Sequence, residues 1–131
     1  MIAQLRGVAR RVSDTQGIID CRGVGYRVRW TKHTAELAAE GTHVEVDVHQ
    51  VITEHSHELY GFIVPGEIEL FLDLIKCKRI GATTAIRAMS SAGSPMHVRA
   101  LIADGDIGGL SKLKGLGPKG AETVVKKLGG R

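Results

Sequence analysis

Aromatic residues, cysteines and long apolar runs are all scarce in this sequence of 131 residues. Phe, Trp and Tyr make up 4% of the chain, and no apolar run is long enough to span a membrane. The first residues lack the pattern of a secretory signal peptide. Cys21 and Cys77 lie far apart without a Cys-x-x-Cys spacing, which argues against a disulfide framework or a zinc site. We expect both to be small buried apolar residues of a cytoplasmic protein.

Motifs for catalysis are missing as well. The sequence has no GxxxxGK[ST] phosphate-binding loop, so the protein is not expected to hydrolyse ATP by itself, and no catalytic residue is predicted. His49, His55 and His57 lie close in sequence, but no cluster of Cys or Asp accompanies them. Exposed alternating histidines of this kind are usually solvated, so we predict no metal and no cofactor.

Positive charge is concentrated in the second half of the chain. Residues 1–65 hold seven Lys/Arg against eight Asp/Glu, a net charge of −1. Residues 66–131 hold eleven against six, a net charge of +5. A basic C-terminal half fits a polyanionic partner, although a solvated basic face explains the same excess.

The first half has the period of β-structure. Tyr26, Val28 and Trp30 alternate with Arg27 and Arg29, which places the apolar side chains on one face and two solvated arginines on the other. Strands are predicted at 4–12, 18–21, 26–30, 43–49 and 57–62, with a short helix at 33–39. Five short strands with glycine-rich corners are typical of a small Greek-key barrel of the oligonucleotide-binding (OB) type, with a five-stranded sandwich as the alternative.

The apolar period changes from 2 to about 3.6 after Pro65-Gly66, which predicts a second, all-helical domain. We therefore expect an OB-fold domain at 1–64 and a helical domain at 65–131. The first helix, at 67–76, is predicted to bury Ile68, Phe71, Leu72 and Ile75. Further helices are predicted at 83–90, 96–103 and 106–110, with Ser94 as an N-cap, and a last helix begins at Pro118.

One turn of the second half has the composition of a phosphate-binding hairpin. Gly115 and Gly117 flank Leu116, which is expected to point inward, and Lys114, Lys119 and Gly120 surround them. Lys112, Lys126 and Lys127 are further candidates for phosphate contact, and the last two suit a helix C-terminus equally well. Glycines permit a tight turn, and the following helix directs free N–H groups and its positive dipole end at an anion. A Gly-x-Gly before a helix is also common in plain helix connections. Ile80-Gly81 aligns with Leu116-Gly117, which indicates a degenerate repeat of two helix–hairpin–helix units.

Five short signatures together resemble the RuvA family, whose members bind Holliday junctions within the RuvAB branch-migration complex. They occur in the family order between Met1 and about Leu128: Leu5-Arg6-Gly7, Gly23-Val24-Gly25-Tyr26, Leu59-Tyr60-Gly61-Phe62, Glu69-Leu70-Phe71 with Leu74-Ile75-Lys76, and Gly115-Leu116-Gly117-Pro118-Lys119 with Ala121-Glu122. The resemblance implies an OB-type domain, a domain with two helix–hairpin–helix motifs, and a flat homotetramer, or an octamer of two tetramers, on the four arms of a junction. It also implies roles in DNA recombination, repair and the SOS response, in a bacterial, phage or mobile-element protein that works in the cytoplasm near the nucleoid.

The resemblance also implies two kinds of DNA-contacting site. The hairpins would hold minor-groove phosphates, the second through Lys114, Gly115, Leu116, Gly117, Lys119 and Gly120, and the first through Lys78, Arg79, Ile80, Gly81, Thr83 and Thr84. An acidic pin in the last hairpin loop of the OB domain would lie near the crossover. The family usually has two acids there, whereas this chain has Glu54 followed by His55, and a histidine can become cationic at mildly acidic pH.

Two further departures from the family concern the first hairpin and the end of the chain. Arg79-Ile80-Gly81-Ala82-Thr83 lacks one glycine, the proline and the lysine of the family pattern, so we expect a hairpin with altered geometry that still binds; a purely structural turn is the alternative. The sequence stops about where family members continue into a domain that contacts the RuvB motor. The third, motor-binding domain is thus expected to be absent, as in a truncated or short form, and contact with a RuvB-type motor is in doubt; RuvC-type resolvases are the family's other partners.

We therefore predict a non-enzymatic protein that binds four-way junction DNA as a tetramer, as the DNA-binding subunit of a RuvAB-type branch-migration complex. Two alternatives stay open. One is a short RuvA-like junction binder that is uncoupled from the motor and competes with or recruits other processing enzymes. The other is a general single-strand DNA-binding OB protein, against which the scarcity of aromatic residues argues, since such proteins stack bases on rings. A DNA glycosylase with a similar hairpin would need a catalytic Asp well downstream of Lys119, where this chain has none.

Overall fold

The computed structural model describes residues 1–129 and divides the chain into two units, Met1–Ile68 and Glu69 onward. Gly130 and Arg131, near which the sequence analysis placed the start of a linker, lie outside the described residues. The predicted boundary at Pro65-Gly66 falls just before the helix that begins at Glu67, whose first two residues belong to the first unit. No helix among the described residues has the length and apolarity needed to cross a membrane.

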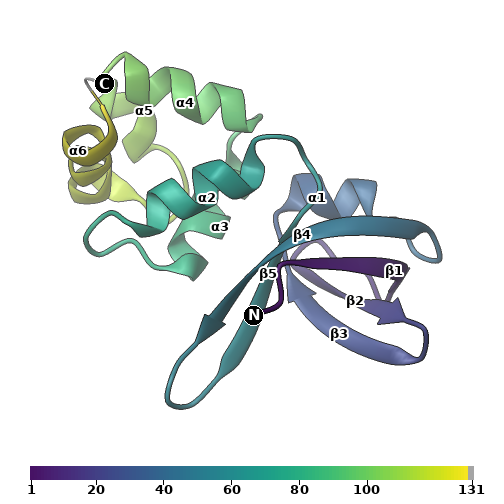
Figure 1. Ribbon diagram of the computed structural model, residues 1–131. Helices are drawn as coiled ribbons and strands as arrows, with labels where there is room; N and C mark the ends of the chain where they lie inside the picture. The colour runs from purple at the N-terminus through teal and green to yellow at the C-terminus, as the bar shows by residue number, and fades with distance from the viewer. Residues whose placement is uncertain (130–131) are drawn as a thin grey trace. The chain divides into compact units, whose positions relative to one another are not determined.

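The first unit is a closed barrel of five strands in the order β1-β2-β3-β5-β4 (Figure 1). Its elements are β1 (Gln4–Arg10), β2 (Gln16–Cys21), β3 (Val24–Arg29), α1 (Lys32–Leu37), β4 (His43–Ile52) and β5 (His57–Phe62). Neighbouring strands are antiparallel except β3 and β5, which pair in parallel and close the barrel. The predicted OB-type barrel is thus confirmed, and the sandwich alternative is wrong because the strands form a single closed sheet.

The barrel core follows the predicted alternation of apolar and polar side chains. Val28 and Trp30 are fully buried together with Ile19 and Val46, whereas Arg27 and Arg29 are exposed. The Nε of Arg29 lies 2.8 Å from Oε2 of Glu58 on the neighbouring strand, which is the kind of cross-strand ion pair that a solvated face carries. The two arginines therefore belong to the solvated exterior, as predicted.

The connection between β2 and β3 is shorter than the sequence suggested. The predicted break of four residues is wrong, because Val24 and Gly25 already belong to β3 and pair with Cys21 and Asp20. Only Arg22 and Gly23 form the turn, both with positive φ (54° and 95°). Such a two-residue turn matches the right-handed twist of the strands that it joins. β4 also extends beyond its predicted end, as far as Ile52.

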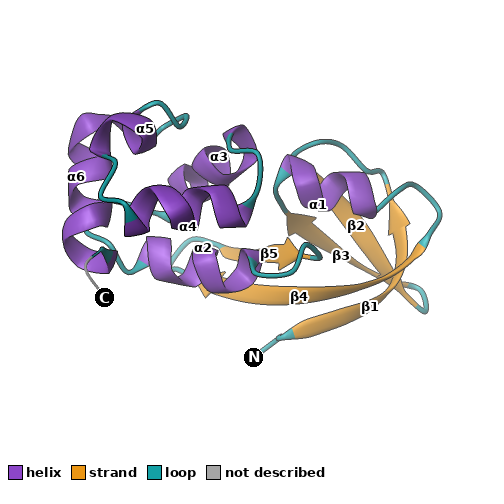
Figure 2. Ribbon diagram, turned by 90° about the horizontal axis from the view of Figure 1, so that it is seen from above, coloured by secondary structure: helices purple, strands orange, loops and turns teal. Residues whose placement is uncertain are grey.

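A carboxylate is buried where the helix after the barrel begins. Glu67 has an exposed fraction of 0%, and its two oxygens accept hydrogen bonds of 2.6 Å from the hydroxyls of Thr31 and Thr34 on and before α1. Thr31 in turn caps α1 by accepting from the Thr34 N–H (3.1 Å), and the Thr34 hydroxyl accepts from the Ile63 N–H (3.0 Å). The network thus joins α1, the end of β5 and Glu67 within the first unit; Figure 2 shows α1 beside the strands.

The second unit consists of helices joined by short turns. Its elements are α2 (Glu67–Ile75, which begins in the first unit), α3 (Ala82–Ser91), α4 (Pro95–Ala103), α5 (Ile107–Ser111) and α6 (Gly117–Leu128). Ser94 caps α4 by accepting from the His97 N–H, and Asp106 caps α5 by accepting from the Gly109 N–H. The cap at Ser94 was predicted, whereas Asp106 was predicted as the first helical residue and is instead the N-cap. Both side chains satisfy N–H groups that the first helical turn leaves unpaired.

The buried face of α2 differs from the predicted one. Leu70, Phe71 and Leu74 are buried, whereas the predicted Ile68, Leu72 and Ile75 are only half-buried. The helix is apolar around most of its circumference, so the 3.6-residue period has no sharp polar face to fix its orientation.

Candidate nucleic-acid interface

The second turn, residues 112–116, joins α5 to α6 and has the geometry predicted for a phosphate-binding hairpin. Gly115 and Gly117 have φ values of 82° and 65°, a region that L-residues with a side chain adopt only at a cost. The side chain of Leu116 between them is 7% exposed, so it anchors the turn in the core. Only the backbone of Leu116 remains available to a ligand.

Donor groups of the second turn are divided between the fold and the surface. The Lys114 N–H donates to Oγ of Ser91 on α3 (3.0 Å), so it is not free, contrary to the expectation for this turn. The N–H groups of Gly115 and Gly117 have no acceptor among the described residues. The side chains of Lys114 and Lys119 are exposed beside them. The turn therefore brings together two unpaired backbone donors and two exposed cations, the groups that an anion site requires.

The helices that follow the two turns also differ from the others in their caps. Thr31, Ser94 and Asp106 each supply a side-chain acceptor to the first turn of α1, α4 and α5. The N-cap residues Gly81 of α3 and Leu116 of α6 supply none. The first N–H groups of α3 and α6 are thus left to water or to a ligand.

The first turn, residues 76–81 between α2 and α3, repeats the backbone bonds of the second. Cys77 N–H donates to Leu74 O and Ile80 N–H to Cys77 O. Leu113 N–H to Leu110 O and Leu116 N–H to Leu113 O are the same bonds 36 residues further along. Ile80, like Leu116, is buried, with an exposed fraction of 4%. The degenerate repeat inferred from Ile80-Gly81 is therefore present in the backbone.

The two turns differ at their glycine positions. Arg79 stands where the second turn has Gly115 and adopts the same left-handed backbone, with a φ of 67°. Gly81 stands where the second turn has Gly117, but its φ is −89°. The side chains of Lys78, Arg79 and Thr83 are exposed and that of Thr84 is half-buried. The first turn thus keeps the left-handed backbone of the second turn at Arg79, where it has no glycine, and this conformation strains the backbone.

Replacing Arg79 by glycine is expected to stabilise the helical unit. A left-handed conformation costs an L-residue about 1–2 kcal/mol, and the larger backbone entropy of glycine offsets about 0.5–1 kcal/mol of the gain. We therefore expect Arg79→Gly to raise the free energy of unfolding by about 0.5–1 kcal/mol, measured by helical circular dichroism. Arg79→Ala is the matched control, because it removes the same charge but keeps the strain. Equal stability of the two variants would contradict strain at this position.

The predicted pin lies at the end of the β4–β5 hairpin, which extends from the barrel (Figure 1). Its turn is closed by Thr53 and Ser56: Thr53 N–H donates to Ser56 O (2.8 Å), Ser56 N–H to the Thr53 hydroxyl (3.1 Å), and the two hydroxyls lie 2.9 Å apart. Glu54 and His55 occupy the two central positions, and both are exposed. The neighbouring Ile52 is 60% exposed. The tip therefore presents one carboxylate, one imidazole and an apolar side chain to solvent.

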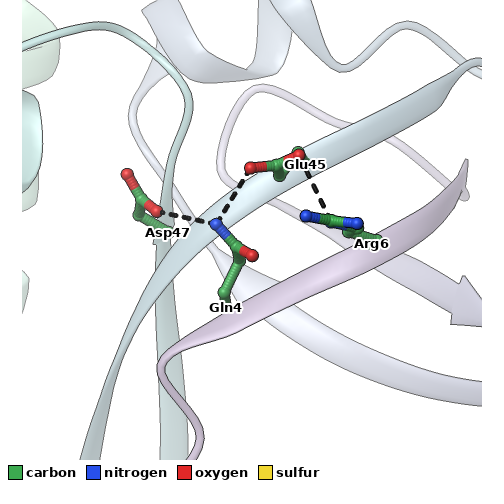
Figure 3. A network of polar contacts seen from close by, with 4 residues as sticks. All are labelled: Gln4, Arg6, Glu45 and Asp47. Carbon is green, nitrogen blue, oxygen red and sulfur yellow. Dashed lines mark hydrogen bonds and ion pairs between the residues drawn. The ribbon is translucent and has the colours of Figure 1, made fainter.

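The outer face of β1 and β4 carries two carboxylates beside Arg6. Glu45 accepts from Nε2 of Gln4 (3.0 Å) and pairs with Nε of Arg6 (3.3 Å), and Asp47 lies 3.5 Å from the same Gln4 nitrogen (Figure 3). All four side chains are exposed. The charge of Arg6 is compensated here, so this arginine is poorly placed to attract a phosphate backbone.

A basic recess, which the sequence analysis missed, lies between the first turn and α6. It has a volume of about 560 Å³ and is lined by Lys76, Lys78, Arg79, Thr123, Lys126 and Lys127. A second hollow of about 330 Å³ is lined by Arg79, Lys119, Glu122, Thr123 and Lys126. The fold therefore brings residues of the first turn together with cations of α6 that are nearly 50 positions away in sequence.

Aromatic side chains offer no platform for stacking bases. The sequence has five of them, all in the described part of the chain. Trp30, Tyr60, Phe62 and Phe71 are buried, and Tyr26 is half-buried. Proteins that bind single strands through an OB barrel stack bases on exposed rings, so the barrel lacks that feature.

The fold places the chain among proteins that join an OB-type barrel to a helical unit. The RuvA N-terminal domain family matches residues 1–61. Curated relatives, each named "Holliday junction branch migration complex subunit RuvA", match almost the whole chain: 39% identity over 128 residues with the protein of Flavobacterium psychrophilum, 37% over 129 residues with that of Myxococcus xanthus, and 37% over 131 residues with that of Lactococcus lactis subsp. cremoris. These matches cover 98%, 98% and 100% of this chain, and 66%, 63% and 66% of the relatives. The chain belongs to the RuvA family and spans about two thirds of the length of these relatives.

Proposed function

We propose that this protein binds four-way junction DNA and that it does so as a homotetramer. The observation that carries the proposal is the pair of turns with uncapped following helices, of which the second combines free N–H groups with Lys114 and Lys119. Contacts of this kind hold the phosphate backbone and read no bases, so they suit a ligand recognised by shape. The names of its relatives, subunits of a Holliday junction branch migration complex, support the same substrate.

Assembly of four protomers would explain how weak phosphate contacts give selectivity for a junction. One pair of turns contributes only a few phosphate contacts, which gives modest affinity for any duplex. Four copies around a symmetry axis multiply these contacts only on a substrate with four arms, because the contacts after the first are then intramolecular. Selectivity for a junction over linear duplex therefore needs no base-specific side chain.

The test compares a four-way junction with a linear duplex of the same length and composition in a mobility-shift titration at several salt concentrations. We expect a preference for the junction of at least a hundredfold and a steep loss of affinity with salt. Native mass spectrometry with and without the junction reports whether four protomers, or eight, assemble on it. Equal affinity for both DNAs would overturn the proposal, and stronger binding of single-stranded DNA would favour the OB-type single-strand binder instead.

In a branch-migration complex the chain would supply junction recognition. A RuvB-type motor would supply the ATP-driven movement, and a RuvC-type resolvase would act on the same junction. Co-sedimentation of this chain with a RuvB-type motor, in the presence of a junction, tests the contact between the chain and the motor. If the junction alone retains the same amount of motor, the result argues against that contact.

Glu54 is proposed to act as a pin at the crossover, where its carboxylate would repel phosphates and keep strands apart. We expect Glu54→Ala to tighten junction binding up to about fivefold per protomer, since removing one carboxylate a few ångström from a phosphate relieves about 1 kcal/mol in water. We also expect it to reduce opening of base pairs at the crossover, measured with a fluorescent base analogue. Glu36→Ala on α1 is the control for loss of one exposed acid. An unchanged fluorescence signal in the Glu54 variant would contradict the pin.

A further inference from the structure

The helix after the first turn lacks the lysine that follows the second turn. With the offset of 36 that relates the turns, Thr83 of α3 corresponds to Lys119 of α6, and Ala82 corresponds to Pro118. The second turn is therefore followed by a cation in the first turn of its helix, whereas the first cation of α3 is Arg87, further along the helix. A phosphate held at the first turn would depend on Lys78 and Arg79 of the turn itself and on charge from another element.

The recess between the first turn and α6 supplies such charge. Lys76, Lys78 and Arg79 approach it from the first turn, and Lys126 and Lys127 approach it from the last turn of α6. No acid lines it. Five cations around one hollow repel one another, and an anion bound between them would relieve that repulsion.

Most of these cations are not used within the fold. Lys76 pairs with Asp73 on α2 (Nζ to Oδ1, 3.7 Å). The side chains of Lys78, Arg79 and Lys126 form no ion pair with any residue between 1 and 129. Their charges are therefore available to a ligand.

The hollow beside the recess continues it toward the second turn. The two hollows share Arg79, Thr123 and Lys126, and the second one reaches Lys119 and Glu122. Cations thus follow one another from Lys78 to Lys119 across the surface of α6. A mononucleotide needs one compact site, whereas successive phosphates of a polymer need a track of this kind.

We propose that this recess and the hollow beside it hold consecutive backbone phosphates of one DNA strand, with Lys126 of α6 supplying the charge that the start of α3 lacks at Thr83. The inference rests on the proposed function, because it assigns a second contact to the same DNA. Lys78 and Arg79 bind the phosphate from the side of the turn and Lys126 from the side of the helix. The first turn then binds DNA together with α6.

The test measures the salt dependence of junction binding for Lys126→Gln and Lys78→Gln, with Lys32→Gln on α1 as the matched control for loss of one exposed lysine. Each phosphate contact contributes about 0.9 to the slope of log affinity against log salt. We expect each recess variant to lower the slope by about that amount per protomer and to weaken binding about tenfold per protomer at 0.1 M salt. The Lys32 variant should match the wild type.

The outcomes separate this inference from the proposed function. If the wild type shows no preference for a junction over duplex, the proposed function fails. If the preference holds but Lys126→Gln has the slope of Lys32→Gln, the recess proposal alone is overturned. A lower melting temperature with an unchanged slope would likewise overturn it, since Lys126 would then only stabilise the helix end.

A second measurement locates the DNA directly. A cysteine at Thr123, paired with a junction that carries a thiol-reactive group on one backbone phosphate, should cross-link in high yield at one phosphate of each arm. A cysteine at Glu36 should not cross-link. Absence of a Thr123 cross-link would overturn the proposal. So would displacement of the junction by millimolar pyrophosphate if Lys126→Gln had no effect on the salt slope, because the recess would then bind small phosphate ligands.

Discussion

Replacing Glu67 by alanine is expected to lower the free energy of unfolding of the barrel unit by about 3 kcal/mol. The change leaves the hydroxyls of Thr31 and Thr34 without the acceptor that each reaches at 2.6 Å. A hydrogen bond to a charged group contributes about 1.5–3 kcal/mol, and a buried donor without a partner adds its desolvation cost. Trp30 is the single tryptophan and is fully buried in the barrel, so its fluorescence during urea unfolding reports on this unit. A loss below about 1 kcal/mol would show that both threonines find other acceptors.

Glu67→Gln separates the charge of this group from its packing. Burial raises the pKa of Glu67 above its ordinary value of 4.5, and the hydrogen bonds from Thr31 and Thr34 oppose that shift without cancelling it. The folded state therefore holds this proton more tightly than the unfolded state. The resulting stabilisation is complete below pH 4.5 and is lost as the pH rises through the raised pKa.

The wild-type barrel should therefore gain stability relative to Glu67→Gln as the pH falls from 7 toward 5. Urea unfolding of both proteins, followed by Trp30 fluorescence at each pH, gives the difference. Other acids titrate in both proteins and cancel in this comparison. Curves that stay parallel over the whole range would mean that Glu67 has the same proton affinity in both states.

The largest effect on binding is expected for Lys119→Ala. Lys119 is exposed beside the uncapped start of α6, next to the free N–H groups of Gly115 and Gly117. Loss of one phosphate contact per protomer should weaken junction binding about tenfold per protomer at 0.1 M salt, and up to roughly several thousandfold for four protomers that bind together. Fluorescence anisotropy with a labelled junction measures this loss. Unchanged affinity would place Lys119 off the DNA.

The salt slope of the same variant also counts protomers. A monomer that loses one contact should change its slope by about 0.9, whereas a tetramer should change it by about 3 to 4. Lys32→Ala controls for the change in net charge. A slope change near 0.9 together with a junction preference would contradict binding by four equivalent protomers.

The sequence predicts the fold well where the pattern is local. Alternation at Tyr26 to Trp30 fixed a strand and its buried face, and Ser94-Pro95 and Asp106 marked helix starts that the structure confirms. The pattern was less informative in α2, where apolar residues surround most of the helix and the buried face was misassigned. It also missed Arg22-Gly23 as a complete turn, because arginine rarely adopts a positive φ.

Contacts between distant elements are what the sequence did not reveal. Glu67 reads as an ordinary acid at a helix start, yet its side chain is buried because two threonines more than 30 positions earlier meet it. The sequence suggested that Lys126 and Lys127 contact phosphate near the second turn or favour a helix end, and only the packing of α6 beside the first turn brings them to Arg79. The predicted contact residues Ile80 and Leu116 show the converse, since their buried side chains leave only backbone for a ligand.

In the turn at the end of the β4–β5 hairpin, the residues that close the turn differ from the residues that are exposed at its tip. Its closure depends on Thr53 and Ser56, which bond to each other through backbone and hydroxyl groups. Neither Glu54 nor His55 has a positive φ or a side-chain bond to the turn. Substitutions at these two positions should therefore leave the turn conformation unchanged. Charge and size at the tip can be varied one residue at a time, by evolution or by design, without rebuilding the hairpin that carries it.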